Sequence, residues 1–231
     1  TLCRVRRTCF AESNPPPDIS MQMRMTRMRK TLILLAGYPA TGKSTFCREL
    51  LKRHPELPVI APDDIKEQVW DEFGFDSAEE KAKLEKVVWE RYYKKLDECM
   101  SRGESLVSDY PFSDKQKPTL VKLVAKYGYH TITVRFVGDL DEIYKRSLKR
   151  DLSQERHLGH LMNHYHKGDY LADRTKADAL VTRELLEHRC VEKGYGSFVL
   201  GDLVEVDATD IASVDEAAVV DQVEALAEKY A

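Results

Sequence analysis

The chain has 231 residues, of which 42% are hydrophobic and 32% charged, and its formal net charge is −3 at pH 7. This composition fits a single soluble α/β domain with insertions or two small domains. A weakly acidic chain has no general positive field, so we expect no binding of a long nucleic acid along its length. The longest strongly apolar run, residues 32–36, is far shorter than the roughly 18 residues of a membrane span. The sequence therefore also argues against a membrane protein.

The five cysteines lie far apart, and no two of them form a CxxC pair. An odd number at such spacing disfavours both a disulfide framework and a zinc ribbon. We therefore expect a reducing, cytoplasmic setting.

Residues 1–27 differ in composition from the rest of the chain. They hold five Arg, two acidic residues and three consecutive prolines, without helical or strand periodicity. We expect a disordered basic tail. Its Arg-rich start is similar to a targeting peptide, but Met28 lies just before the first apolar run and favours a tail that is not native. The remaining residues, 28–231, carry 31 basic and 37 acidic side chains, a net charge of −6.

From residue 31 onwards, short apolar runs alternate with stretches of helical periodicity. Strands are expected at residues 31–36, 58–61, 105–108, 131–137 and 203–206. Helices are expected at residues 43–53, 64–73, 77–102, 114–127, 139–150, 174–191 and 214–230. This alternation predicts an α/β fold: a five-stranded parallel sheet with helices on both faces and ligands at the carboxyl ends of the strands.

A phosphate-binding motif follows the first expected strand. Residues 37–44 match GxxxxGK[ST], and they lie between a strand and a helix as that motif requires. Backbone N–H groups would wrap nucleotide phosphates, Lys43, expected to be exposed, would offset their charge, and the Ser44 hydroxyl would hold Mg²⁺. The candidate nucleotide-binding residues are Gly37, Tyr38, Pro39, Ala40, Thr41, Gly42, Lys43, Ser44 and Thr45.

Two carboxylates follow the second expected strand. Asp63 is placed to accept the proton of a hydroxyl substrate, and Lys66, one turn later, to hold an anionic group of that substrate. Asp64 is a further candidate for substrate binding. Either carboxylate also suits a helix cap, so one can cap while the other acts as the base.

Asp109 ends the third expected strand and faces the same crevice. It is a candidate for holding a magnesium-bound water, together with Ser44, or the acceptor hydroxyl. The alternative is that Asp109 only initiates a turn before Pro111.

Arg146 and Arg150 are four residues apart on an expected helix and therefore share one face. Two guanidinium groups one turn apart form a phosphate clamp, which Arg156 can join from the following loop. Neighbouring charges, Asp151 among them, allow the alternative of a mixed-charge, solvated helix face.

Residues 151–170 contain four of the seven histidines: His157, His160, His164 and His166. No cysteine lies near them, and we expect a lid that excludes water, with histidines that contact substrate or phosphate, rather than a metal site. Trp70 and Trp89 lie on helical stretches and are expected in the core.

Four blocks together resemble P-loop phosphotransferases of the polynucleotide kinase and zeta toxin type, with chloramphenicol phosphotransferase more distant. These blocks are residues 37–45, 63–66, 108–109 and 145–150, and the resemblance runs over residues 28–210. It implies a three-layer P-loop NTPase fold, with ATP and Mg²⁺ as cofactors. It further implies that Asp63 is the base, that Lys66 binds substrate phosphate, and that the arginines belong to a lid.

The resemblance predicts a kinase domain at residues 28–231, with a lid and substrate insertion at about residues 151–200. Pro62 stands where those kinases have a basic residue, and residues 157–200 have no counterpart in them. The expected activity is transfer of the ATP γ-phosphate to a hydroxyl of a small molecule, nucleoside or nucleic-acid end. The alternative is an ATPase or nucleotide switch without an acceptor.

Overall fold

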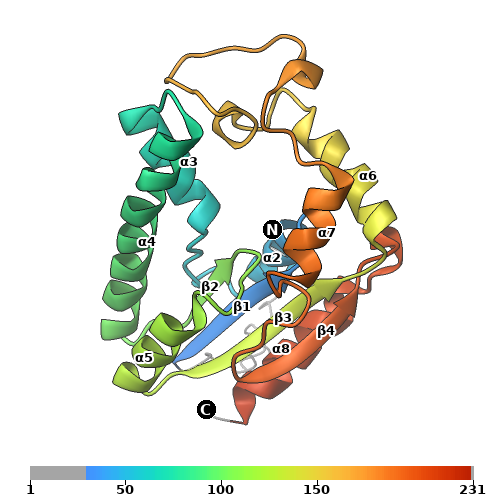
Figure 1. The fold of residues 1–231 in the computed structure, drawn as a ribbon. Helices are drawn as coiled ribbons and strands as arrows, with labels where there is room; N and C mark the ends of the chain where they lie inside the picture. The colour runs from blue at the N-terminus through green and yellow to red at the C-terminus, as the bar shows by residue number, and fades with distance from the viewer. Residues whose placement is uncertain (1–29, 230–231) are drawn as a thin grey trace, which may run out of the picture.

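A computed structural model describes residues 30–229, and the tail predicted at residues 1–27 lies outside this range. The centre of the fold is a parallel sheet with the strand order β2-β1-β3-β4 (Figure 1). Its strands are β1 (Thr31–Gly37), β2 (Leu106–Asp109), β3 (His130–Val137) and β4 (Asp202–Asp207). An α/β fold with a parallel sheet is therefore confirmed.

Burial of the strands follows their position in the sheet. β1 lies between β2 and β3, and all seven of its residues are buried. A strand that is covered on both faces reads as a continuous apolar run, which is what its sequence TLILLAG shows. At the edge of the sheet, β4 alternates buried and exposed residues over Val204, Glu205 and Val206.

The expectation of a fifth strand at residues 58–61 is wrong, because the sheet has four strands over the described residues 30–229. Residues 58–61 do lie beside β2, but only Val59 forms a bridge, to Val107. Pro58 has no N–H to donate, and Pro62 already begins the next helix. Too few residues therefore remain between the two prolines for a ladder.

Helices cover both faces of the sheet, as expected. On one face lie α2 (Lys43–Arg53) and α8 (Glu216–Glu228), which pack Phe46, Leu50 and Val220 against alternate residues of β1. On the other face lie α3 (Pro62–Phe73), α4 (Ala78–Ser101) and α5 (Lys117–Tyr127). Two further helices, α6 (Leu140–Asp151) and α7 (Arg183–Val191), contact each other. They lie on the side of the molecule away from α3 and α4 (Figure 1).

The segment between α6 and α7 passes above the carboxyl ends of the strands toward α3 (Figure 1). It contains two 3₁₀ turns, η1 (Leu158–His160) and η2 (Arg174–Lys176). Leu161 and Tyr165 of this segment pack against Trp70 of α3, which is buried as predicted.

The single helix predicted at residues 174–191 is wrong in its first half. The α-helix is confined to α7, which begins where the Thr182 hydroxyl accepts a hydrogen bond from the backbone N–H of Leu185, and residues 174–176 form only the 3₁₀ turn η2. A hydroxyl cap of this kind starts a helix afresh.

Within residues 30–229, no helix combines the length and the apolar character that crossing a bilayer requires.

The chain leaves β1 through Gly37, where the backbones of β1 and β3 come closest. Gly37 has a φ of 102°, and a Cβ at this position would lie 2.0 Å from the carbonyl oxygen of Phe136. The same oxygen accepts a hydrogen bond from the N–H of Tyr38 at 2.8 Å. Only glycine therefore allows the following loop to start where it does.

We predict that Gly37→Ala lowers the free energy of unfolding by about 3 kcal/mol or more, because strain at positive φ adds to the overlap with Phe136. The matched control is Gly128→Ala, which also has positive φ but meets no atom within 4 Å. The control is expected to lose about 1 to 2 kcal/mol from strain alone. Urea unfolding of both variants measures the difference, and equal losses would contradict the close approach.

Candidate functional site

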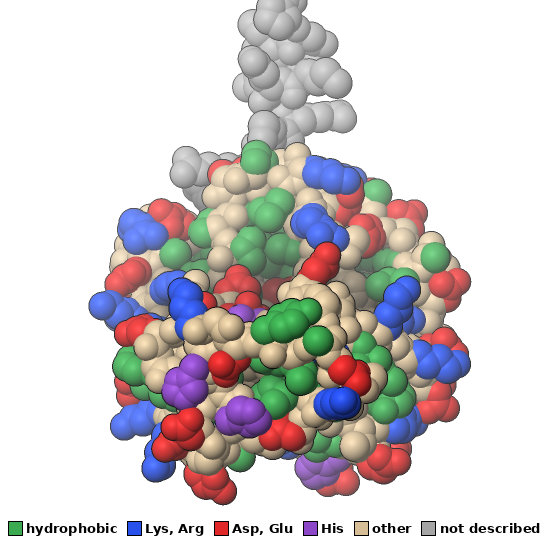
Figure 2. Space-filling view, turned by 90° about the horizontal axis from the view of Figure 1, so that it is seen from above, with side chains coloured by type: hydrophobic (Ala, Val, Ile, Leu, Met, Phe, Trp, Pro, Cys, Tyr) green, Lys and Arg blue, Asp and Glu red, His purple; other side chains and the backbone are tan. Residues whose placement is uncertain are grey.

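A cavity of about 1270 Å³ opens at the carboxyl ends of β1 and β2. Its walls come from the loop after β1, from α3, α4, α6 and α7, and from the segment that joins α6 to α7. Seen from above, this end of the molecule mixes basic, acidic and histidine side chains (Figure 2). The sequence placed its candidate residues at this end of the sheet, and the cavity is lined by members of all four blocks.

The loop of residues 37–45 delivers the start of α2 to the cavity. Gly42 is the N-cap residue of α2 and has no side chain to cap it. The first N–H groups of a helix have no partner within the helix, and together with the helix dipole they attract anions. All residues from Pro39 to Thr45 line the cavity.

Lys43 is buried, which corrects the expectation that it is exposed. Only 7% of the residue is accessible, and its Nζ donates a hydrogen bond to the carbonyl oxygen of Tyr38. Burial lowers the pKa of Lys43, while the carboxylate of Asp109 opposes that shift. The side chain thus folds back over its own loop and holds its charge at the cavity floor.

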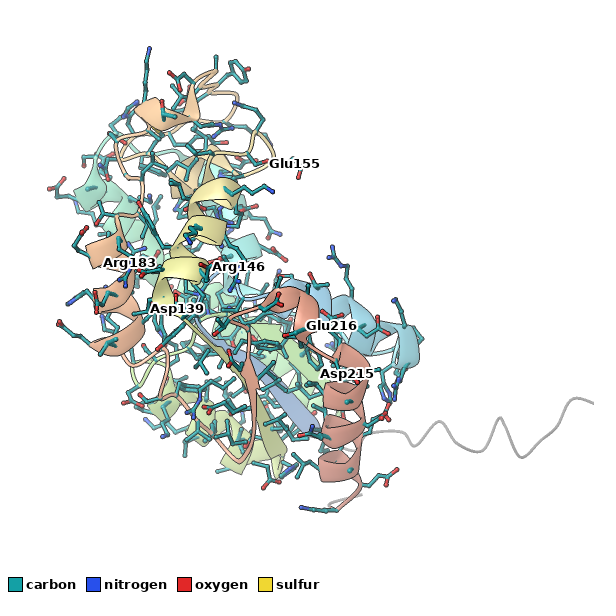
Figure 3. The ribbon with its side chains drawn as sticks, turned by 90° about the vertical axis from the view of Figure 1, so that its right-hand side faces the viewer. Asp139, Arg146, Glu155, Arg183, Asp215 and Glu216 are labelled. Carbon is teal, nitrogen blue, oxygen red and sulfur yellow. The ribbon has the colours of Figure 1, made fainter. Side chains whose placement is uncertain are left out.

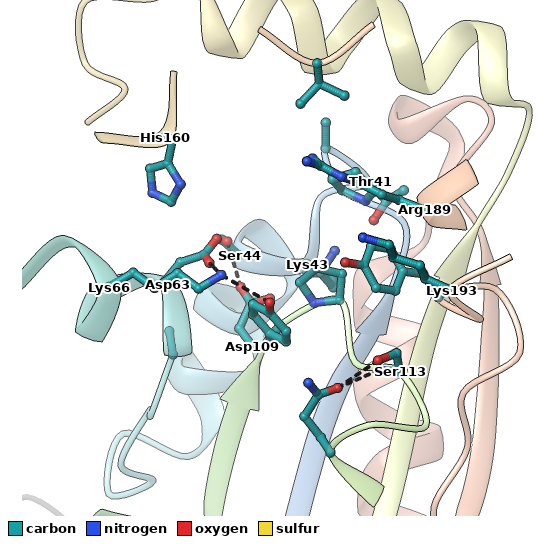
Figure 4. A pocket seen from close by; sticks show the side chains of 18 of the residues that line it. Thr41, Lys43, Ser44, Asp63, Lys66, Asp109, Ser113, His160, Arg189 and Lys193 are labelled. Atoms are coloured by element: carbon teal, nitrogen blue, oxygen red, sulfur yellow. Dashed lines mark hydrogen bonds and ion pairs between the residues drawn. The ribbon is translucent and has the colours of Figure 1, made fainter. Parts of the chain in front are cut away.

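Ser44 and Asp109 meet beside Lys43 (Figure 4). The Ser44 Oγ donates a hydrogen bond of 2.8 Å to Asp109 Oδ2. Burial raises the pKa of Asp109, although Lys43 opposes this shift. A hydroxyl and a carboxylate oxygen are the hard ligands that Mg²⁺ prefers, so this pair fits the expected metal site.

Asp63 and Asp64 lie in the first turn of α3, but neither side chain caps the helix, whose N-cap is Ala61. The Asp63 carboxylate faces the cavity and lies 3.6 Å from Lys66 Nζ. Burial alone would raise the pKa of Asp63, but Lys66 and nearby cationic groups outweigh it and hold this pKa below its ordinary value. Burial and the carboxylates of Glu67 and Asp63 instead raise the pKa of Asp64.

Lys66 joins α3 to the loop after β2. Its side chain is 13% exposed, and its Nζ donates to the Tyr110 hydroxyl at 3.1 Å and lies 3.6 Å from Glu85. Burial lowers the pKa of Lys66, but Tyr110, Asp63 and Glu85 together raise it above the ordinary value. Lys66 is therefore a fixed positive charge beside Asp63.

Arg146 does not share a partner with Arg150. Its guanidinium donates to the backbone carbonyl oxygens of Ala40 at 3.1 Å, Thr209 at 2.8 Å and Ala208 at 2.6 Å. Arg146 thus projects from α6 and ties the phosphate-binding loop to the turn after β4 (Figure 3). Its guanidinium therefore binds backbone carbonyl oxygens of this chain.

The structure instead brings Arg150 together with Arg156 through Asp151. One oxygen of Asp151 accepts two hydrogen bonds from Arg150, at 2.9 and 2.7 Å, and lies 3.7 Å from Arg156 Nε. The Asp151 side chain is only 5% exposed, and both arginines line the cavity. Sequence analysis missed Asp151 because an acidic residue among lysines and arginines is also typical of a solvated helix face.

Of the four clustered histidines, only His160 lines the cavity. Its Nε2 lies 2.7 Å from Glu67 Oε1, and its ring stands edge-on to Trp70. The other three pair with carboxylates of α3 and neighbouring segments: His157 with Asp71, His164 with Asp178 and His166 with Asp76. The expectation that the histidines as a group contact substrate is therefore not what the structure shows.

Trp89 is half-buried and lines the cavity, whereas the sequence placed it in the core. Its ring stands edge-on to Tyr110 at a centroid distance of 5.3 Å and to Tyr92 at 5.4 Å. Helical periodicity places Trp89 next to the buried stripe of its helix. It does not reveal whether the ring packs against another helix or faces a cavity.

Residues 32–164 match the model of the AAA_33 family, which is described as an AAA domain. This range contains the phosphate-binding loop, Asp63, Asp109, Asp151 and Arg156. The matched range ends before α7, so the walls that α7 contributes lie outside it.

Two of the solved structures that resemble this chain show the same fold. A candidate kinase from Chloroflexus aurantiacus J-10-fl is 26% identical, with a TM-score of 0.65 over 84% of this chain and 96% of its own. The protein APE1195 is 16% identical, with a TM-score of 0.51 over 87% of this chain and 97% of its own. A gluconokinase from Sinorhizobium meliloti 1021 aligns more loosely, at 15% identity and a TM-score of 0.47 over 89% of this chain and 95% of its own. The family match and the first of these structures confirm the resemblance to P-loop kinases.

Two lysines of the cavity should titrate far apart. Burial and the positive charge of Lys66 lower the pKa of Lys81 to about 8, whereas the pKa of Lys66 is raised. We predict that NMR spectra recorded between pH 6 and pH 11 show the Lys81 Cε resonance moving near pH 8 while that of Lys66 stays constant. Lys81→Arg and Lys66→Arg variants assign the two signals. Titration of both lysines together would contradict the charge arrangement described above.

Proposed function

Since the chain belongs to the AAA_33 family, we propose that it is a kinase that transfers the γ-phosphate of ATP to a hydroxyl of a small molecule, nucleoside or nucleic-acid end. One observation supports this most: a phosphate-binding loop, an oxygen pair that suits Mg²⁺, an ionised carboxylate and two joined arginines all line one cavity. These are the parts that phosphoryl transfer needs.

Residues 37–45 and Lys43 would bind the phosphates of ATP through backbone N–H groups and the ammonium. Ser44 and Asp109 would hold Mg²⁺, which when bound offsets the negative charge of the phosphates. Arg146 keeps this loop in place from α6, because its guanidinium holds the carbonyl of Ala40.

Asp63 would act as the base. The acceptor oxygen attacks the γ-phosphorus and forms a new P–O bond, the bond from the γ-phosphorus to the bridging oxygen breaks, and ADP leaves with the bonding electrons. The acceptor proton passes to the Asp63 carboxylate, which the nearby cations keep ionised. Arg150 and Arg156 would offset charge on the moving phosphoryl group.

An acceptor screen with γ-labelled ATP tests this function. A kinase transfers the label to one of the hydroxyl compounds, whereas an ATPase or switch releases labelled phosphate without labelling any of them. The arginine pair and the covering segment between α6 and α7 favour transfer, since a closed site keeps water from competing with the acceptor.

Asp63→Asn is predicted to lower kcat by roughly 10²- to 10⁴-fold, the usual scale for a lost general base. The affinity for ATP should stay the same, because Asp63 lies on α3 and not in the phosphate-binding loop. Asp64→Asn is the matched comparison and should lower kcat less, since Asp64 makes no ion pair within residues 30–229. Steady-state kinetics and calorimetric titration with ATP separate the two effects. A larger loss with Asp64→Asn would assign the base to Asp64 instead.

Arginine variants should divide into two groups. Arg156→Gln is predicted to lower kcat by about 10²- to 10³-fold with little change in ATP affinity, as expected when one donor to the moving charge is lost. Asp151→Asn should act in the same direction, because Asp151 positions both Arg150 and Arg156. Arg146→Gln should mainly weaken ATP binding, since it releases the loop from α6.

The double variant Arg156→Gln/Asp151→Asn adds a further check. If Asp151 acts through the arginines, its effect is smaller in the Arg156→Gln background than in the wild type, because only Arg150 remains for it to position. Additive effects, or an Arg146→Gln variant that loses kcat at unchanged ATP affinity, would contradict this division of roles.

A further inference from the structure

Three cations from separate segments form a second positive group in the cavity. Arg189 lies on α7, Lys193 follows the end of that helix, and Lys115 lies in the loop between β2 and α5. Arg189 and Lys193 lie on the side of the cavity opposite Asp63 and Lys66 (Figure 4). None of the three belongs to the motifs that the sequence singled out. Together they are called the cation cluster.

In the part of the chain that the structure describes, no carboxylate forms an ion pair with the cation cluster. Within residues 30–229, none of its three side chains makes a hydrogen bond or an ion pair. Other basic side chains that line the cavity are paired: Lys66 with Asp63, Arg150 and Arg156 with Asp151, and Arg146, Lys43 and Lys81 with backbone carbonyls. Glu192, the acidic neighbour of Lys193, pairs with His188.

The three cations lie close enough to repel one another. Burial lowers the pKa of Lys193, and the positive charges of Arg189 and Lys115 lower it further. A protein with a net charge of −6 over residues 28–231 has acidic side chains in excess. Three cations left together at a cavity wall therefore suit an anion that comes from outside the chain.

Tyr195 lies near both the cluster and the proposed base. Tyr195 also lines the cavity, and its pKa is raised by burial while Arg189, Lys66 and Asp63 all act on it. Ser113 and Gln116, hydrogen-bonded to each other at 3.0 Å, add polar groups to the same wall. One small molecule can thus lie between the cluster and Asp63.

We propose that the acceptor carries an anionic group, a phosphate or a carboxylate, which binds to Lys115, Arg189 and Lys193 while its hydroxyl lies at Asp63. Arginine binds either group through two parallel N–H donors, and the lysines add charge without fixing direction. This inference rests on the proposed function, because a bound anion is a phosphate acceptor only if the protein is a kinase. The class of substrate is then a small hydroxy acid or a hydroxyl-bearing phosphate ester.

The first test is a calorimetric titration with inorganic phosphate, in the presence of Mg²⁺ and a saturating non-hydrolysable ATP analogue that occupies the phosphate-binding loop. Phosphate should bind the wild type, and the double variant Arg189→Gln/Lys193→Gln should bind it at least about 10-fold more weakly, as expected for lost charge-assisted hydrogen bonds. Lys94→Gln removes a charge of the same sign outside the cavity and should change nothing. Among residues 30–229, neither Arg189 nor Lys193 has a partner to lose, so the double variant should unfold at the wild-type urea concentration.

Equal phosphate affinity in the double variant and the wild type would overturn the proposal. So would a variant that binds the ATP analogue more weakly but phosphate equally well, because the cluster would then serve the nucleotide. If the analogue does not bind at all, the proposed function fails on its own, and phosphate titration of the same variants still decides whether the cluster binds anions.

The second test compares acceptors in matched pairs with labelled ATP: ribose with ribose 5-phosphate, and glycerol with glycerate. Transfer should favour the anionic member of a pair, and the double variant should lose this preference. Ribose 5-phosphate and glycerate distinguish phosphate from carboxylate as the recognised group. Equal transfer to neutral and anionic members would confirm the kinase and overturn the anionic acceptor.

Discussion

The parallel pairing of β1 with both of its neighbours is the constraint on which the site depends. In register, Leu35 lies opposite Asp109 of β2, and Gly37 lies opposite Phe136 of β3. The strands end at one edge, so the loop that leaves β1 meets the carboxylate that ends β2. The Ser44–Asp109 hydrogen bond joins residues 65 positions apart because of this register. Both faces of β1 pack against helices, so its register is costly to shift. A slip of one residue would turn each side chain to the opposite face and lose its packing there.

Burial and opposite charge act against each other throughout the cavity, and the balance differs from group to group. Asp63 is held ionised because several cations outweigh its burial, whereas Asp109 meets mainly Lys43 and its pKa rises. The carboxylate proposed as the base is thereby the one with the lower pKa. Opposite charge also positions the arginines. The buried Asp151 carboxylate lies between two guanidinium groups and fixes their position without blocking their remaining N–H donors.

Local signals in the sequence carried most of the fold and the centre of the site. The phosphate-binding loop, the helix that it opens and the strand ends at Asp109 depend on neighbours in the chain, and these were predicted. The predicted strand at residues 58–61 was wrong because two prolines limit its length. The predicted helix at residues 174–182 was wrong because the periodic pattern continues across a new helix cap at Thr182. Arg146 has partners 62 to 106 residues away, which periodicity and motif spacing do not reveal. Lys43 and Asp151 have partners within five residues, but those contacts depend on how the loops fold back. The cation cluster was missed for the same reason: α7 reaches the cavity only through tertiary packing.

Attachment of the covering segment to α3 links two parts of the proposed chemistry. His157 and Tyr165 both contact the Asp71 carboxylate, at 3.1 and 2.6 Å, and the backbones of Phe75 and Tyr165 exchange two hydrogen bonds. The N–H of Gly159 donates to His157 Nδ1, so the proton of this ring lies on Nε2 and is donated to Asp71. A segment held at this many points moves with α3 rather than independently of it. Since α3 also carries Asp63, the group proposed to take the proton and the segment proposed to exclude water are coupled in position by the fold.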